Sequence, residues 1–416
     1  MKSQDTHNMI IVGAATLIWG VINYLVHPIA VRHLSTADFG EFAALLGMIN
    51  IIGFIMSAGT IITLKLIAQH HSKSDFMYYL KTKLQRPLLG IWLVVCCVIA
   101  VSAWWIGHAL QISNQRWIII MWISIVTSLY GIILGAILQS GWWFRLLSVV
   151  GIIGSVIKLG LIVLVLFWLH GWTTQAVGAI VLGGWVSFVL TECLVRKHLW
   201  SHNTQDTKQY DGTLIQELKH SSKTYLKLIL ITVMIGILTN GDILIAQYVF
   251  GGEVSWTYAS VAIIAKFVVF IWLAAETVLL PKLLNINQTP SRSQIWSIMM
   301  VMWWFGMVSL TGWWLLWWWV LQLLKPWLES QVWLLLWALA ISWCILTLSI
   351  SSKTLVNSWS RAPLRIMWIA GILRYLVSTM QTQLSNYVQW SVIILWASTI
   401  VIQWLRRASA KSSSNS

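Results

Sequence analysis

The chain alternates between long apolar runs and short polar segments. Most apolar runs are about 20 residues long, which is the length that an α-helix needs to cross roughly 30 Å of hydrocarbon. The pattern therefore predicts an all-α polytopic membrane protein. Its twelve predicted membrane-spanning helices cover residues 9–31, 42–68, 88–110, 117–140, 147–169, 175–195, 224–248, 256–280, 295–320, 331–350, 366–382 and 388–405.

The composition excludes an ordinary soluble protein. Hydrophobic residues make up 58% of the 416 residues and charged residues only 9%, and the mean hydropathy is +0.77. Soluble domains carry about a quarter charged residues. The four cysteines all fall within predicted spans, where we interpret them as small buried hydrophobic residues without a redox or metal role; they are Cys96, Cys97, Cys193 and Cys344.

The net charge of +15 reflects membrane topology and gives no reason to expect a nucleic-acid partner. If the N-terminus is cytoplasmic, most of the 27 Lys and Arg residues lie in cytoplasmic segments, and only Arg32, Arg116 and Lys325 lie in outer ones. The positive-inside rule accounts for such a bias. We therefore expect a multi-pass protein of the cytoplasmic (inner) membrane with both termini in the cytoplasm and in contact with membrane lipids.

The spans fall into two sets of six. The longest hydrophilic stretch, 196–223, divides an N-terminal lobe, 1–195, from a C-terminal lobe, 224–405, and a polar cytoplasmic tail follows at 406–416. Residues 24–55 and 240–271 resemble each other weakly at an offset of 216 residues, and in both a polar span is followed by a short turn and an aromatic-Ala pair. Transporters commonly place two such lobes around a site near the membrane midplane.

Three cations lie near the middle of predicted spans. Lys158 and Lys266 are each about ten residues into a span, roughly 15 Å deep at 1.5 Å per residue, and Arg374 is comparably deep. A charge at that depth is costly and normally faces a bundle interior or a wet cavity. Because only Asp242 is obviously available as a buried counter-charge, we predict that the three cations line a cavity for an anionic ligand.

The acidic residues offer a second role. Asp242 can form an ion pair with Lys266 or Lys158, or it can exchange H⁺ or Na⁺ during a transport cycle; an ion pair is the favoured interpretation. Glu276 lies close enough to the inner face to reach the headgroups and is a further candidate for pairing or coupling. No metal site and no cofactor is expected.

Other polar residues in the spans are candidates for substrate contact. Arg32 ends the first span at the outer rim, Asn50 lies nine residues into the second span, and Lys65 lies near the inner end of the second span. In the first span, His27 and Asn23 share one helix face. We interpret these two as making hydrogen bonds between helices, and neither is counted as a substrate ligand.

The sequence contains none of the common motifs of catalysis. It has no HExxH, no P-loop, no GxGxxG with an acidic partner and no Cys/His cluster, and it lacks the large outer loop that a membrane-embedded glycosyl transferase or ligase would need. We therefore expect a protein that is not an enzyme.

Several segments resemble the polysaccharide-transport (Wzx-type flippase) family of the MOP superfamily. The family pattern Arg-x-Leu-Ser/Thr-x-x-x-Phe/Tyr-Gly near the end of the first span is matched by Arg32, Leu34, Ser35, Phe39 and Gly40. Segments 137–160, 241–267 and 274–283 resemble the family's junctions between later spans, and the likeness is weak beyond residue 285.

The resemblance implies twelve helices in two six-helix lobes that form a V-shaped, MATE-like bundle. It also implies alternating access of an undecaprenyl-diphosphate-linked oligosaccharide for cell-surface polysaccharide biosynthesis, with the anionic diphosphate on the buried cations and polysaccharide polymerase or assembly proteins as further partners. A lipid II flippase and a multidrug exporter of the same superfamily remain alternatives, and a polytopic glycosyl transferase or ligase is the alternative from another class.

Tryptophan is unusually abundant. The chain has 31 Trp and 26 Gly, and Trp256 stands where the family pattern has Gly. Tryptophan normally gathers at membrane interfaces, whereas glycine is frequent within membrane helices. One hypothesis is that some Trp codons are UGA codons that the source organism reads as glycine; the alternative is a transporter that tolerates many tryptophans.

Overall fold

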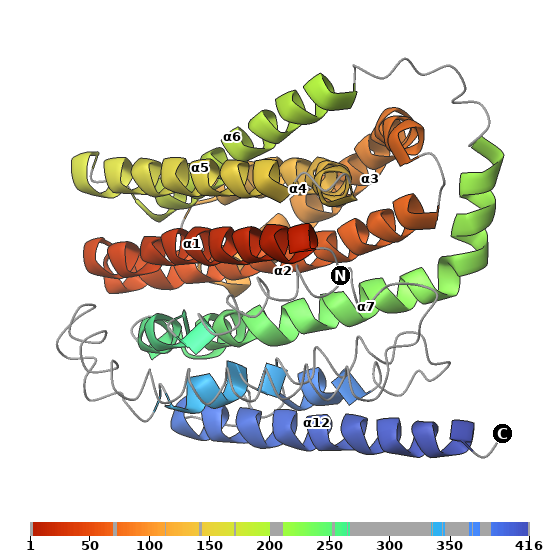
Figure 1. Ribbon diagram of the computed structural model, residues 1–416. Coiled ribbons are helices and arrows are strands. Elements are labelled where there is room, and N and C mark those ends of the chain that lie inside the picture. The colour runs from red at the N-terminus through yellow and green to blue at the C-terminus, as the bar shows by residue number, and fades with distance from the viewer. Residues whose placement is uncertain are drawn as a thin grey trace.

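The computed structural model in Figure 1 is built from helices. No strand occurs among the residues that it describes. The described residues are 3–69, 73–112, 114–140, 144–169, 172–199, 211–251, 254–263, 265–266, 334, 336–342, 344–345, 366–367, 369–374 and 384–414.

Six long helices of the N-terminal half form the upper part of Figure 1. The fifth ends in one π-helical turn, Leu164–Trp168, before the chain reverses. The helices are α1 (Ser3–His33), α2 (Thr36–Gln69), α3 (Lys73–Ala109), α4 (Trp117–Ser140), α5 (Phe144–Val163) and α6 (Thr173–Leu199).

The C-terminal half lies below the first in the same view. Helix α7 (Asp211–Val249) starts at the right-hand edge, turns, and then runs along α2, and α12 (Leu384–Ser414) closes the lower side. Between α7 and α12, the structure describes a helix at Val254–Ile263 and helical residues at 336–342 and 369–374.

The predicted spans agree with these helices wherever the chain is described. The first seven spans and the last coincide with α1 to α7 and α12, and the eighth, tenth and eleventh begin or lie in the shorter helical stretches. The ninth, at 295–320, lies outside the described residues. In the predicted linker 196–223, α6 ends at Leu199 and α7 already begins at Asp211.

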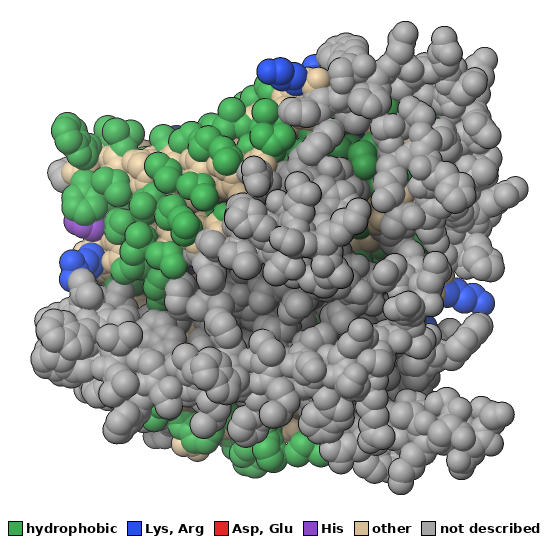
Figure 2. Space-filling model, in the orientation of Figure 1, with side chains coloured by type: hydrophobic (Ala, Val, Ile, Leu, Met, Phe, Trp, Pro, Cys, Tyr) green, Lys and Arg blue, Asp and Glu red, His purple; other side chains and the backbone are tan. Residues whose placement is uncertain are grey.

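The described helices have the length and surface of membrane spans. Large apolar side chains point outward along them, such as Val156, which is 53% exposed. Figure 2 shows apolar side chains over the described part of one face, with Lys and Arg only near its margins. Water would disfavour so large an apolar surface, whereas lipid does not. Five described helices are long and apolar enough to cross a membrane: Thr36–Leu64, Trp117–Gln139, Leu146–Trp168, Thr173–Lys197 and Ser222–Val249.

The two halves meet mainly along α2 and α7. Glycines let these two helices approach closely. A Cβ atom added at Gly236 of α7 would lie 2.9 Å from Cβ of Phe54, and one added at Gly47 of α2 would lie 3.5 Å from the carbonyl oxygen of Asn240. Substitution of Gly236 would therefore push the two halves apart, whereas a Cβ atom at Gly47 would make an ordinary van der Waals contact.

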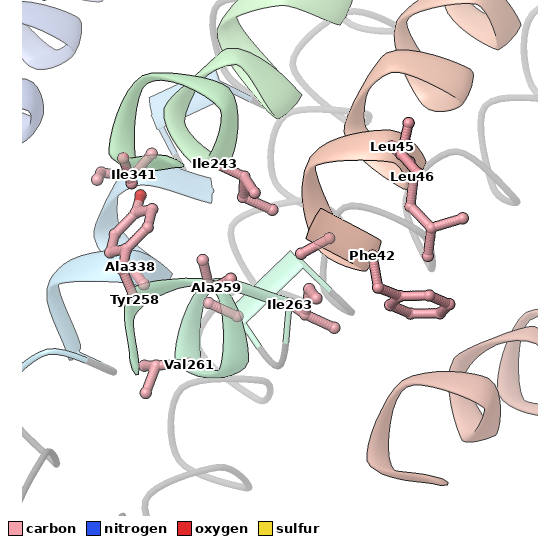
Figure 3. Close-up of a cluster of buried hydrophobic side chains, with 14 of the residues drawn as sticks. Phe42, Leu45, Leu46, Ile243, Tyr258, Ala259, Val261, Ile263, Ala338 and Ile341 are labelled. Carbon is pink, nitrogen blue, oxygen red and sulfur yellow. The ribbon is translucent and has the colours of Figure 1, made fainter. Parts of the chain in front are cut away.

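One apolar core continues from one half into the other. Figure 3 shows α2 side chains on one side of it and C-terminal side chains on the other. A second cluster groups the ends of α2, α4 and α6 with the start of α3, and Tyr225 of α7 packs there. The residues labelled in the first core are Phe42, Leu45, Leu46, Ile243, Tyr258, Ala259, Val261, Ile263, Ala338 and Ile341.

Candidate functional site

A strip of polar residues interrupts the apolar sequence of α7. Thr239, Asn240, Asp242 and Gln247 are all buried. Thr239 and Asn240 donate hydrogen bonds to the carbonyl oxygens of the residues four positions before them, at 2.7 and 3.3 Å. Such bonds satisfy a polar side chain within its own helix when no water is at hand. Asp242 has no donor to offer, so it needs cationic or hydroxyl partners from other positions.

Asp242 has two such partners on the helix that follows α7. Its Oδ1 atom lies 2.7 Å from Nζ of Lys266, and its Oδ2 atom accepts a hydrogen bond of 2.7 Å from the hydroxyl of Tyr258. The exposed fractions are 1% for Asp242 and 5% for Lys266. The ion pair that the sequence favoured for Asp242 is thus present, and it is formed with Lys266.

Arg374 lies on the other side of this cluster. Its Nη1 atom donates a hydrogen bond of 3.0 Å to the carbonyl oxygen of Leu238, one helical turn before Asp242. Asp242, Tyr258 and Tyr387 are its electrostatic neighbours. The Nε and Nη2 atoms of Arg374 are buried without a hydrogen-bond partner among the described residues. Lys266 and Arg374 therefore share one carboxylate, which leaves this cluster with an excess of positive charge.

A small pocket opens beside Lys266, at the junction of the two halves. The N-terminal half contributes α1 and α2, and the C-terminal half contributes α7 and the following helix. Asn50 of α2 reaches across it to Asn240 of α7 in a long contact of 3.5 Å. The pocket is lined by His27, Ala43, Leu46, Gly47, Asn50, Asn240, Ile243, Ile263 and Lys266.

Lys158 approaches the same region from α5. It is half-buried, and its backbone packs so tightly against α6 that a Cβ atom at Gly183 would lie 2.7 Å from its Cα. Lys158 and Lys266 both act electrostatically on His27. The pocket lining includes Lys266 but neither Lys158 nor Arg374. In this conformation Lys266 is the one of the three predicted cations that lines the pocket.

The other candidates lie apart from the pocket or outside the described part. Arg32 is exposed in the last turn of α1. The side chain of Lys65 and the whole of Glu276 lie outside the described residues. Asn23 donates a hydrogen bond of 3.0 Å to the hydroxyl of Ser155, a contact between α1 and α5.

Sequence reasoning missed two features of this region. Glu41 is buried at the start of α2, so Asp242 is not the only buried acid as the sequence suggested; the Phe39–Phe42 stretch that encloses it could have indicated this. His27 was assigned to a bond between helices, but its buried Nδ1 atom has no hydrogen-bond partner in the described structure and its ring lines the pocket.

The described residues offer no site for a resident metal. No group of three or more His, Cys, Asp or Glu side chains in this part of the chain could hold an ion. The pocket's polar groups are amides, an imidazole and an ammonium, which suit an anion better than a cation.

Solved structures with a similar architecture include MATE transporters. A variant of the Vibrio cholerae MATE transporter VcmN superposes with a TM-score of 0.69 at 14% identity, over 98% of each chain. The fold is that of a MATE transporter. Inward-facing and outward-facing structures of a multidrug resistance MATE transporter of the MOP superfamily give TM-scores of 0.65 and 0.64, both at 12% identity. These alignments cover 98% and 99% of this chain and 99% and 97% of the matched chains.

The chain therefore has the all-α fold of these transporters, and its described helices include five that are long and apolar enough to cross a membrane. The amino-acid sequence matches no protein-family model and no curated protein. At 10–14% identity the structural likeness shows the fold alone, so the choice of substrate depends on the residues of the pocket.

Proposed function

We propose that this protein is a flippase or exporter that moves an undecaprenyl-diphosphate-linked oligosaccharide across the cytoplasmic membrane for cell-surface polysaccharide biosynthesis. The observation that carries the proposal is Lys266, a buried cation that lines a pocket formed by both halves of the molecule. An anion bound there would contact both halves at once. Its entry and release would therefore respond to their relative movement.

The pocket's chemistry suits a diphosphate headgroup. Lys266 supplies charge from the C-terminal half and Lys158 lies near by on the N-terminal half, while Asn50 and His27 offer donors to phosphate oxygens. The lipid tail would stay in the bilayer beside the apolar outer surface. The likeness to both inward-facing and outward-facing MATE structures supports alternating access as the mode of movement.

The orientation and the partners belong to the same proposal. The distribution of Lys and Arg favours cytoplasmic termini. Polysaccharide polymerase or assembly proteins would receive the product on the outer side. Asp242, and Glu276 outside the described part, are the candidates for coupling transport to H⁺ or Na⁺ movement.

The alternatives differ in the charge that the pocket must accept. A multidrug exporter, as two of the matched proteins are described, typically takes cationic drugs and would need acids in its pocket, but the described lining of this pocket has a lysine and no acid. A lipid II flippase would need the same cationic pocket, and its substrate differs from the proposed one only in the sugar. A glycosyl transferase or ligase is disfavoured by the absence of catalytic motifs in the sequence.

The proposal is tested by flipping of a fluorescent lipid-diphosphate saccharide in proteoliposomes. Lys266→Ala is expected to reduce the rate most, Lys158→Ala less, and Arg374→Ala to an extent set by its effect on Asp242. Arg116→Ala is the matched control, because Arg116 is exposed and does not line the pocket. Wild-type flipping rates in all three variants, Lys158→Ala, Lys266→Ala and Arg374→Ala, would contradict the proposal. The same assay with lipid II and with a cationic dye as substrates distinguishes this proposal from the lipid II flippase and the multidrug exporter.

A further inference from the structure

The buried cluster behind the pocket contains two cations and one carboxylate. Lys266 faces the pocket and is bound to Asp242 at 2.7 Å. Arg374 lies outside the pocket lining, is 2% exposed, and interacts electrostatically with the same carboxylate. An anion that takes Lys266 as its ligand must therefore compete with Asp242 for it.

Loss of Lys266 would leave the buried carboxylate of Asp242 without a counter-charge. An uncompensated charge in a protein interior is strongly destabilising, and breaking a buried pair by removing one partner typically costs several kcal/mol. Lys266 is thus available to an anion only if the carboxylate is neutralised in another way, by H⁺ or Na⁺ or by a second cationic side chain within reach. Without such a partner, the cost of the unpaired Asp242 would cancel the attraction between Lys266 and the anion.

Arg374 has the free donors that this role requires. Its Nη1 atom donates to the carbonyl oxygen of Leu238. Nε and Nη2 make no hydrogen bond of good geometry among the described residues, and the hydroxyl of Tyr387 is their polar neighbour. Leu238 precedes Asp242 by one helical turn, so the guanidinium is held against the face of α7 from which Asp242 projects. The guanidinium fork binds a carboxylate through two parallel N–H donors.

We propose that Asp242 exchanges Lys266 for Arg374 when an anion enters the pocket, so that Arg374 is a positioning residue that makes Lys266 available. This exchange rests on the proposed function for the identity of the anion, a lipid diphosphate. Tyr258 can follow the carboxylate, because its hydroxyl bonds Oδ2 and not the oxygen that binds Lys266. Each charge keeps a partner before and after the exchange.

The exchange of cations is tested first without any ligand. The measurement is the thermal unfolding midpoint in detergent micelles for Lys266→Gln, Arg374→Gln, the double variant, and the double variant with Asp242→Asn. Each single change leaves Asp242 one cation, so each is expected to lower the midpoint by only a few degrees. The double change leaves the Asp242 carboxylate without a cation, and it should lower the midpoint by clearly more than the sum of the two single changes. Adding Asp242→Asn to the double variant should restore most of that excess.

Additive single and double changes would overturn the exchange, because an arginine that merely ties its own helix to Leu238 has no reason to depend on Lys266. Arg374→Lys keeps the charge and covers the case in which Arg374→Gln does not fold. The double variant of Lys266→Gln with Arg374→Lys should lose less of the unfolding midpoint, beyond the sum of its single changes, than the double variant with Arg374→Gln.

A binding arm with a fluorescent lipid diphosphate completes the test. Asp242→Asn frees Lys266 and should tighten binding about tenfold, whereas Arg374→Gln should weaken it by a similar factor. In the Asp242→Asn background, Arg374→Gln should have almost no effect. A full effect of Arg374→Gln in that background would overturn the exchange. Absence of wild-type binding, with the unfolding result intact, would refute the lipid-diphosphate substrate and leave the exchange between the two cations standing.

Discussion

The Nζ atom of Lys266 lies 2.7 Å from Oδ1 of Asp242, in a position where neither side chain has appreciable exposure. The two residues are 24 positions apart and lie on consecutive helices. A buried ion pair gains little net stability, because desolvation of both charges offsets their attraction. The pair instead keeps Lys266 charged deep in the protein, where this residue lines the pocket between the halves.

The hydroxyl of Tyr258 stabilises the carboxylate of this pair. Tyr258→Phe removes a 2.7 Å hydrogen bond to a buried charge, and we expect it to lower the free energy of unfolding by about 1–3 kcal/mol. Tyr248→Phe is the matched control, since Tyr248 is 48% exposed on the same part of the chain and should change little. Equal unfolding curves for both variants, measured in mixed micelles, would contradict the prediction.

Gly183 sets the distance between α5 and α6 beside Lys158. A Cβ atom there would lie 2.6 Å from Cβ and 2.7 Å from Cα of Lys158, which only backbone movement can relieve. Gly183→Ala is expected to destabilise the protein by about 1–3 kcal/mol, as overpacking does, and to slow transport by displacing Lys158.

The neighbouring glycine provides the control for that experiment. A Cβ atom at Gly184 meets open space, so Gly184→Ala should be neutral, or stabilise the helix slightly through the better helix propensity of Ala. If the two variants have the same melting temperature and the same transport rate, close packing at Gly183 does not position Lys158.

Gln247 joins the two halves where α7 ends. Its Nε2 atom donates to the carbonyl oxygen of Leu110 at 3.3 Å, and its Oε1 atom accepts from the hydroxyl of Ser255 at 2.7 Å. Gly40 leaves room for this amide, because a Cβ atom there would lie 2.7 Å from Oε1. We expect Gln247→Ala to favour separation of the halves by about 0.5–1.5 kcal/mol, which corresponds to a two- to tenfold change in population.

Cysteine labelling measures that change. Asn50→Cys in a background with the four native cysteines replaced by serine reports access to the pocket, and its labelling rate should rise in Gln247→Ala. Gln175→Ala is the control, because Gln175 is exposed and its side chain accepts a hydrogen bond from the backbone N–H of Trp172, within the same half of the protein. An unaltered labelling rate in Gln247→Ala would show that this amide does not hold the halves together.

The exposed tryptophans of the described residues include two at a turn and two in the middle of a helix. Trp168 and Trp172 lie at the turn between α5 and α6, 80% and 74% exposed, as expected for an interfacial belt. Trp185 and Trp396 are exposed near the middle of α6 and α12, where a belt does not explain them. The recoding hypothesis predicts glycine at Trp185 and Trp396 in protein purified from the source organism, read by peptide mass spectrometry. Tryptophan at both positions would refute it there.

The sequence predicted the helices well and the site only in part. Runs of about 20 apolar residues identified α1 to α7 and α12, because an unsatisfied backbone in lipid allows little besides a helix. Burial of Lys266, Asp242 and Arg374 followed from the same runs. The position of His27 in the pocket and the burial of Glu41 were missed, because a polar residue within or beside an apolar helix does not reveal whether it faces a neighbouring helix, a pocket or lipid.

By itself the sequence determined which segments enter the membrane and that charge lies deep within them, since the cost of transferring each side chain into hydrocarbon is local and additive. Only the tertiary structure decided that Asp242 pairs with Lys266, that Arg374 stays behind it, and that Asn50 and His27 complete the pocket. A helix that is apolar all round has no preferred face. Its rotation is therefore set by how glycines such as Gly236 and Gly183 let neighbouring helices pack, and that packing exists only in the folded chain.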